Sequence, residues 1–125
     1  MSVQSYRDLL VWQQGMGLAE TCYRLSKSFP REEMFRMTSQ LRRAAVSVPA
    51  NIAEGSGRGS RKEYMRFLGI AQGSLKELET HLLLAVRVGL SPEASIQPML
   101  QQAESVGKML RSLRRKLAER ARPSS

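Results

Sequence analysis

Hydrophobic residues recur every three to four positions along most of the chain, which is the spacing of an amphipathic α-helix. The pattern is longest in the last third, where Pro92 suits a first helical turn and Ser91 before it suits the cap. The spacing therefore predicts a helix over 92–119. Its apolar stripe holds for three heptads and consists of Ile96, Met99, Ala103, Val106, Leu110, Leu113 and Leu117.

Three more helices are predicted upstream of this one. Ser60 and Glu63 match the S-x-x-E capping box, and Gly89 suits the left-handed residue beyond a helix end, so we predict a helix over 61–88. Near the N-terminus a further stripe predicts a helix over 6–28; it consists of Leu9, Trp12, Met16, Ala19 and Tyr23.

The segment between Pro30 and Gly55 also has helical spacing, which predicts a helix over 32–54. Pro49 lacks a backbone N–H, so we expect this helix to bend near Ser47–Pro49. A carbonyl that loses its partner there needs another donor, and the side-chain amide of Asn51 is near enough in sequence to supply one.

Four helices with short connections make an antiparallel up-down-up-down four-helix bundle, here with a kinked second helix. No window alternates with the two-residue period of a strand, so we predict an all-α chain. One domain covers 1–119, and 120–125 form a short basic tail that we expect to be frayed.

The predicted helix 6–28 carries a second apolar set beside the first. Two interpretations remain open: a broad stripe that faces the core, or a subunit interface that buries the extra set. The second set is Val11, Leu18, Cys22 and Leu25.

Composition excludes several classes of protein. Among the 125 residues Cys22 is the only cysteine and His81 the only histidine, so no intrachain disulfide or structural zinc site is expected. Asp8 is the only aspartate, and no acid–base pair or activated nucleophile can be assembled, so we predict no catalytic residues and no cofactor. We interpret Cys22 as a buried structural thiol and His81 as a residue at the edge of the core.

The chain has no apolar run of the length that spans a membrane and no recognisable secretion signal, so we expect a cytoplasmic protein without membrane contact. Its net charge of +9 and pI near 10.6 favour an anionic partner.

A glycine-rich stretch at 55–60 precedes the predicted helix 61–88. It matches neither a Walker A loop nor a dinucleotide-binding loop, so it is interpreted either as a flexible turn or as an anion contact. The cations that favour the second interpretation are Arg58, Arg61, Lys62 and Arg66.

The strongest functional signal is the end of the chain, where seven cations meet one acid, Glu119. Nucleic acid is the favoured partner, because cations beside a buried seam contact phosphates; a solvated helix end and a membrane surface are the alternatives. Without base-reading motifs, binding should be sequence-tolerant. These cations are Lys108, Arg111, Arg114, Arg115, Lys116, Arg120 and Arg122.

Several runs of residues resemble a known family, the four-helix-bundle proteins encoded in intervening sequences of bacterial 23S ribosomal RNA genes. The resemblance covers nearly the whole chain, and its most distinctive part is SVPANIAEG within Gln40–Gly55. The other matching runs are YRDLLVWQ at 6–13, Phe29-Pro30, EYMRFL at 63–68 and AQGSLKELET at 71–80.

The same resemblance extends to the accessory variability protein of diversity-generating retroelements, and it implies a homopentamer with a basic surface. By resemblance, the partner is nucleic acid, and a reverse transcriptase is a further candidate. Our leading hypothesis is a non-enzymatic, oligomeric nucleic-acid-binding accessory protein. The alternative is a protein–protein adaptor whose charge serves only solubility.

Overall fold

The computed structural model describes residues 5–121, and within that range the chain forms helices and turns without a strand. This confirms the prediction of an all-helical chain with four long helices. They are α1 (Leu10–Ser26), α2 (Ser39–Ser56), α3 (Arg61–Arg87) and α4 (Glu93–Ala121). A short turn, η1 (Tyr6–Asp8), precedes α1, and two more, η2 (Arg31–Glu33) and η3 (Met34–Thr38), lie between α1 and α2.

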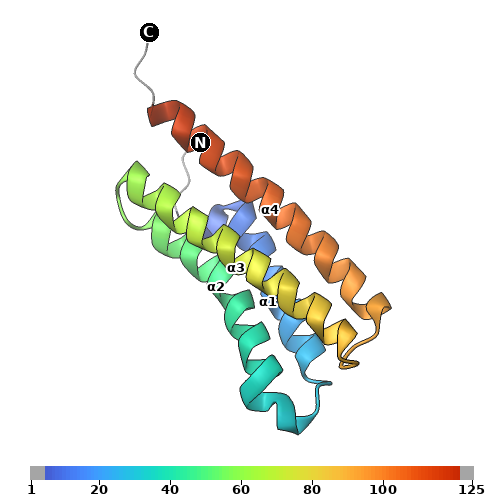
Figure 1. The fold of residues 1–125 in the computed structure, drawn as a ribbon. Helices are drawn as coiled ribbons and strands as arrows, with labels where there is room; N and C mark the ends of the chain where they lie inside the picture. The colour runs from blue at the N-terminus through green and yellow to red at the C-terminus, as the bar shows by residue number, and fades with distance from the viewer. Residues whose placement is uncertain (1–4, 122–125) are drawn as a thin grey trace.

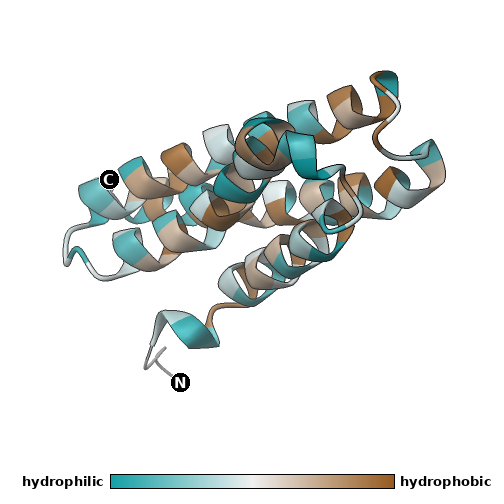
Figure 2. Ribbon diagram, turned by 90° about the horizontal axis from the view of Figure 1, so that it is seen from below, coloured by the Kyte–Doolittle hydropathy of each residue, from teal (hydrophilic) through white to brown (hydrophobic). Residues whose placement is uncertain are grey.

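The four long helices enclose one core. α2 packs against α1 and α3, and α4 packs against α3 and α1. Figure 1 shows that each connection turns the chain back beside the preceding helix, so the start of α3 and the end of α4 lie at the same end of the molecule. Apolar and polar stretches alternate along every helix in Figure 2.

Leucine, isoleucine and valine dominate the core. Full burial of each such side chain contributes roughly 1.5–3 kcal/mol to folding, so this layer is the main source of stability. The largest members with almost no exposure are Leu18, Leu41, Val48, Ile52, Leu68, Leu78, Leu82, Ile96, Met99 and Leu110.

The ends of α3 follow the predicted signals closely. Ser60 Oγ accepts a hydrogen bond from the Glu63 N–H at 3.0 Å, while the Glu63 carboxylate binds Arg66. At the other end Gly89 has a φ of +81°, and the Leu90 N–H donates to the Ala85 carbonyl at 2.9 Å. This bond and the positive φ form a Schellman motif, which ends the helix.

The second helix begins later than predicted. Residues 31–38 form a 3₁₀ turn and a π turn, and Arg36 has φ −122° and ψ −109°, outside the helical region. The regular helix starts at Ser39 and runs through Pro49 to Ser56 without a break in its assignment. The predicted kink near Ser47–Pro49 stays a prediction.

Asn51 donates a hydrogen bond to the backbone, as predicted. Its acceptor, however, is not the carbonyl that lacks a partner because of Pro49. Its Nδ2 lies 2.8 Å from the Ser47 carbonyl oxygen and 2.9 Å from Ser47 Oγ. The carbonyl that loses an N–H partner to Pro49 belongs to Ala45, four residues earlier. Asn51 therefore reinforces the turn next to the proline.

The structure decides between the two interpretations of the second apolar set of α1: this set faces the core rather than a subunit interface. Val11, Leu18 and Cys22 of the second set are buried in the core, whereas Met16 and Tyr23 of the first set are 37% and 42% exposed. Gly15 lies on the same buried side of α1, where an added Cβ would stand 3.6 Å from the Pro49 Cβ, so this side of the helix faces α2.

α4 extends to Ala121, so Arg120 belongs to the helix rather than to a frayed tail. Arg122 and the rest of the predicted tail lie outside the described residues. Over the part of the chain that the structure describes, no helix combines the length and apolar character needed to cross a membrane.

Candidate nucleic-acid interface

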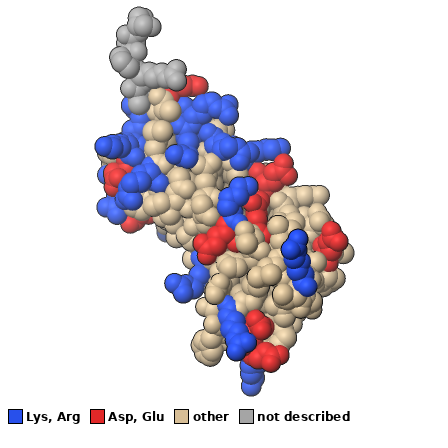
Figure 3. Space-filling model, in the orientation of Figure 1, with Lys and Arg blue, Asp and Glu red and all other residues tan. Residues whose placement is uncertain are grey.

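The two predicted basic sets meet at one end of the bundle. Arg61, the first residue of α3, donates from Nη1 to the carbonyl oxygen of Arg120 near the end of α4, at 3.1 Å. Figure 3 shows Lys and Arg side chains gathered over this end of the molecule. We call this surface the basic end; it comprises Arg58, Arg61, Lys62, Arg66, Arg111, Arg114, Arg115, Lys116 and Arg120.

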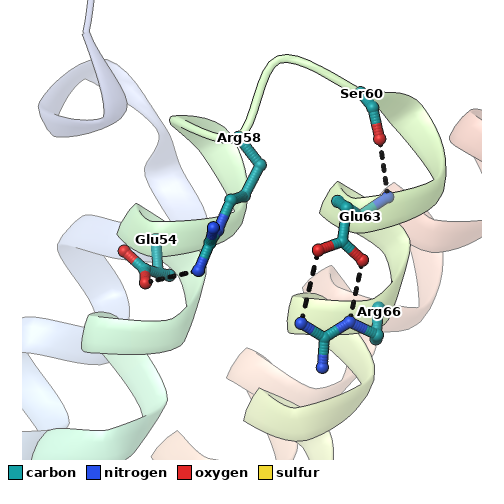
Figure 4. Close-up of polar contacts among 5 residues, drawn as sticks. All are labelled: Glu54, Arg58, Ser60, Glu63 and Arg66. Carbon is teal, nitrogen blue, oxygen red and sulfur yellow. Dashed lines mark hydrogen bonds and ion pairs between the residues drawn. The ribbon is translucent and has the colours of Figure 1, made fainter.

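Two arginines of the basic end are held by carboxylates (Figure 4). Arg58 lies 3.1 Å from Glu54, and Arg66 makes two contacts with Glu63 at 2.8 and 3.3 Å. The hydrogen bond from Arg66 is the main cause that lowers the pKa of the Glu63 carboxyl. Both guanidinium groups also lie over the Phe67 ring, at 5.0 and 4.5 Å from its centre. They form an ordered, partly neutralised edge of the surface.

Arg114 lies between α3 and α4 instead of on an exposed flank. Its Nη1 donates to Gln72 Oε1, its guanidinium lies against Gly69, and its Nε is buried without a hydrogen-bond partner. A Cβ at Gly69 would stand 3.5 Å from the guanidinium, at ordinary contact distance. Arg114 therefore joins two helices, so its replacement should affect the fold as well as the charge.

Six cations of the basic end are exposed and have no carboxylate within 4 Å among residues 5–121. Lys108, also predicted for this surface, pairs with Glu104 at 3.6 Å. Because none of the six forms an ion pair within this range, their charge is available to an external anion. They are Arg61, Lys62, Arg111, Arg115, Lys116 and Arg120.

The glycine-rich stretch is a tight turn. Gly59 has a φ of +79°, and the N–H groups of Gly57 and Arg58 donate at 3.2 Å to carbonyls at the end of α2. These two amides are therefore already paired and do not contribute to an anion contact at this turn.

Cys22 and His81, the two other residues with candidate chemistry, have structural roles. Burial raises the pKa of the Cys22 thiol to about 12, so the thiolate is not formed near neutral pH. His81 is mostly buried, and its Nε2 lies 3.6 Å from Glu77 Oε1. Among the described residues, no three His, Cys, Asp or Glu side chains come together as metal ligands.

An exposed apolar groove runs between α1, α2 and η3, and the sequence patterns did not reveal it. Two adjoining hollows of about 540 and 510 Å³ share Tyr23 and Val46 in their walls. Phe35, beside the irregular Arg36, is 92% exposed. The apolar groove is defined by Met16, Tyr23, Met34, Phe35 and Val46. The signal that could have found it is Gly15, which shows which edge of α1 faces inward.

Comparison with known proteins agrees with this architecture. The sequence profile of the 23S rRNA-intervening sequence protein family matches residues 7–112. The chain belongs to this family. This 23S rRNA-intervening sequence protein carries both a basic end and an apolar groove on its helical fold.

One solved structure similar to the chain is a protein with unknown function from the S23 ribosomal protein family of Bacteroides thetaiotaomicron. The two chains share 26% identity with a TM-score of 0.77, over 83% of this chain and 97% of the other. No protein among those with curated descriptions matches the chain.

Proposed function

We propose that this 23S rRNA-intervening sequence protein is a non-enzymatic accessory protein that binds nucleic acid through its basic end, in the cytoplasm. The observation that carries the proposal is the set of six exposed cations without carboxylate partners, gathered at one end by the contact between Arg61 and Arg120. Such a surface attracts a polyanion and releases its condensed counterions.

The proposed contact is with the phosphate backbone, so it does not distinguish base sequences. The exposed side chains of the basic end are cations, whereas Phe67 is 8% exposed beneath Arg58 and Arg66. Cations alone fix the position of a backbone without reading base edges. RNA and DNA are therefore both candidate ligands.

We also propose that the protein acts as a homo-oligomer, which by resemblance is a pentamer. The apolar groove supports self-association, because large contiguous apolar surfaces usually mark contacts with a partner. Several copies on one polyanion would add avidity, since each further contact is intramolecular.

The experiment that tests this function compares two triple variants with equal charge. Replacing Arg111, Arg115 and Lys116 by Gln removes three free cations of the basic end. The control replaces Lys27, Arg31 and Arg87 by Gln, three exposed cations just after α1, in η2 and at the end of α3. These parts of the chain lie away from the start of α3 and the end of α4 (Figure 1). Binding of a labelled RNA hairpin and a DNA duplex is measured by anisotropy.

We expect the first triple variant to lose most of its affinity at moderate salt and the control to keep it. Equal losses would show that net charge alone drives binding. Unchanged affinity in both variants would contradict the assignment of the interface.

A second candidate function is a protein–protein adaptor, which the apolar groove favours independently of charge. In that case the groove holds another protein, for which a reverse transcriptase is the candidate by resemblance. This function predicts no nucleic-acid binding even at low salt and a stoichiometric complex that mutation of Phe35 abolishes.

A further inference from the structure

A second cavity lies within the basic end itself. It measures about 610 Å³, a size typical of small-molecule sites, and lies between η1, the end of α2, the start of α3 and the end of α4. We call it the tyrosine cleft. The residues that matter for its chemistry are Tyr6, Ser56, Tyr64, Leu113, Leu117 and Arg120.

The walls of the tyrosine cleft suit a flat ring with polar edges. Leu113 and Leu117 supply apolar surface, and Tyr6 and Tyr64 supply aromatic rings. The Tyr6 ring is held by an edge-to-face contact with Trp12, at 5.3 Å between ring centres. Burial raises the pKa of the Tyr64 hydroxyl, so it stays neutral and is able to donate or accept a hydrogen bond.

The charges around the cleft determine which part of a nucleotide enters. α2 ends at Ser56 in the cleft wall, and the carboxyl end of a helix carries partial negative charge, which disfavours a phosphate inside. Arg120 also lines the cleft, and its carbonyl binds Arg61 of the basic end. A phosphate is thus favoured at the rim, with a neutral ring inside.

We propose that the tyrosine cleft takes one unpaired nucleobase of a nucleic acid whose phosphates lie on the basic end. The inference rests on the proposed function and refines its substrate class: structured RNA or DNA with an unpaired nucleotide, rather than a fully paired duplex. Base stacking on aromatic side chains tolerates any base, so this preference is compatible with sequence-tolerant binding.

The test uses two hairpins with equal numbers of phosphates. One carries a single bulged adenine, and the other carries an abasic site at the same position. We expect the wild-type protein to bind the adenine hairpin about tenfold more tightly, because stacking of one base is worth roughly that factor or more. Replacing the adenine by 2-aminopurine adds a direct readout, since its emission changes when the base stacks.

Leu113→Trp fills the cleft without changing charge, and Leu100→Trp is its control. Both leucines are half-buried on α4, but Leu100 lines a different hollow near the start of the helix. We expect Leu113→Trp to bind both hairpins with the weaker affinity and Leu100→Trp to keep the preference. Circular dichroism establishes that both variants fold.

Two outcomes would overturn the inference and are distinguishable from each other. If the wild-type protein bound both hairpins equally and in a salt-sensitive manner, the tyrosine cleft would not be a base site, but the proposed phosphate binding would stand. If the protein bound neither hairpin at low salt, both the proposed nucleic-acid binding and the proposed base site would be contradicted.

Discussion

At Gly55 the backbone of α2 lies directly against α3. A Cβ at this position would stand 2.7 Å from the Phe67 Cβ and 3.3 Å from the Tyr64 carbonyl oxygen. The sequence places this glycine in the distinctive SVPANIAEG run, but the glycine-rich pattern suggested only a flexible turn or an anion contact. Its packing role comes from contact with α3, which no local pattern reveals.

We expect Gly55→Ala to destabilise the protein by about 1–3 kcal/mol, as overpacking of a filled site does. Gly73→Ala is the matched control, because nothing lies within 4 Å of its added Cβ and alanine favours a helix by up to about 1 kcal/mol. Urea unfolding measures both changes. A Gly55→Ala protein as stable as the control would contradict the close approach of α2 and α3.

Cys22 predicts a pH dependence of stability. Burial raises the pKa of its thiol from 9.0 to about 12, so the unfolded chain loses this proton at lower pH than the folded chain. The free energy of unfolding should therefore fall as pH rises from about 9 to 12, by up to about 1.4 kcal/mol per pH unit from this group.

The comparison for this prediction is Cys22→Ala, measured by urea unfolding at several pH values between 8 and 11. The variant should show a shallower fall with pH, even though its cavity lowers stability at every pH. Parallel curves for the two proteins would indicate that the Cys22 thiol ionises without difficulty in the folded state.

At the scale of the elements, the sequence predicted most helix ends, but the predicted helix 6–28 is divided at the extended Leu9 into η1 and α1, and two further features were missed. Caps such as Ser60 and Gly89 act locally, so their patterns are readable from neighbouring residues. The orientation of α1 and the π turn at 34–38 depend on contacts between helices. The candidate site divides in the same way: charge gave its location, and the pairs Glu54–Arg58 and Glu63–Arg66 have the local spacing of helical ion pairs. The contact of Arg114 with Gln72 on α3 needed tertiary structure.

Arg114 contacts Gln72 on α3, whereas the neighbouring Arg115 is exposed, so we expect their substitutions to have different effects. Arg114→Gln should lower the free energy of unfolding by about 1–3 kcal/mol, because it breaks a half-buried polar contact with Gln72. Arg115→Gln should change stability by less than about 0.5 kcal/mol, as exposed substitutions usually do.

Nucleic-acid affinity should show the reverse order. Arg115→Gln removes an exposed cation and should weaken binding, whereas Arg114→Gln should affect binding less in the protein that remains folded. Chemical denaturation and anisotropy measured on the same preparations check the two orders. A larger loss of affinity for Arg114→Gln would return Arg114 to the nucleic-acid interface.

At the scale of the whole molecule, the basic end and the apolar groove occupy different parts of the surface (Figures 1 and 3). The basic end joins the start of α3 to the end of α4, while the groove lies along α1, α2 and η3. Self-association through the groove would therefore leave the cations free for a polyanion, so the two proposed properties are compatible in one assembly.

The groove predicts the mass of the protein in solution. Phe35→Ser should shift the protein toward smaller species in light scattering, because it removes the most exposed aromatic ring of the groove without disturbing the core. Val88→Ser is the control, since Val88 is 58% exposed at the end of α3 and outside the groove. An identical mass for Phe35→Ser and the wild type would show that the groove does not mediate self-association.

The central claim is that free cations of the basic end bind phosphates, and the dependence of affinity on salt tests it most directly. The measurement compares the slope of log affinity against log salt, on one DNA duplex, for the wild type and for the variant in which Gln replaces Arg111, Arg115 and Lys116. Each phosphate contact contributes about −0.9 to the slope, so the variant's slope should be shallower by about 3 per bound chain. Equal slopes for the two proteins would contradict the account.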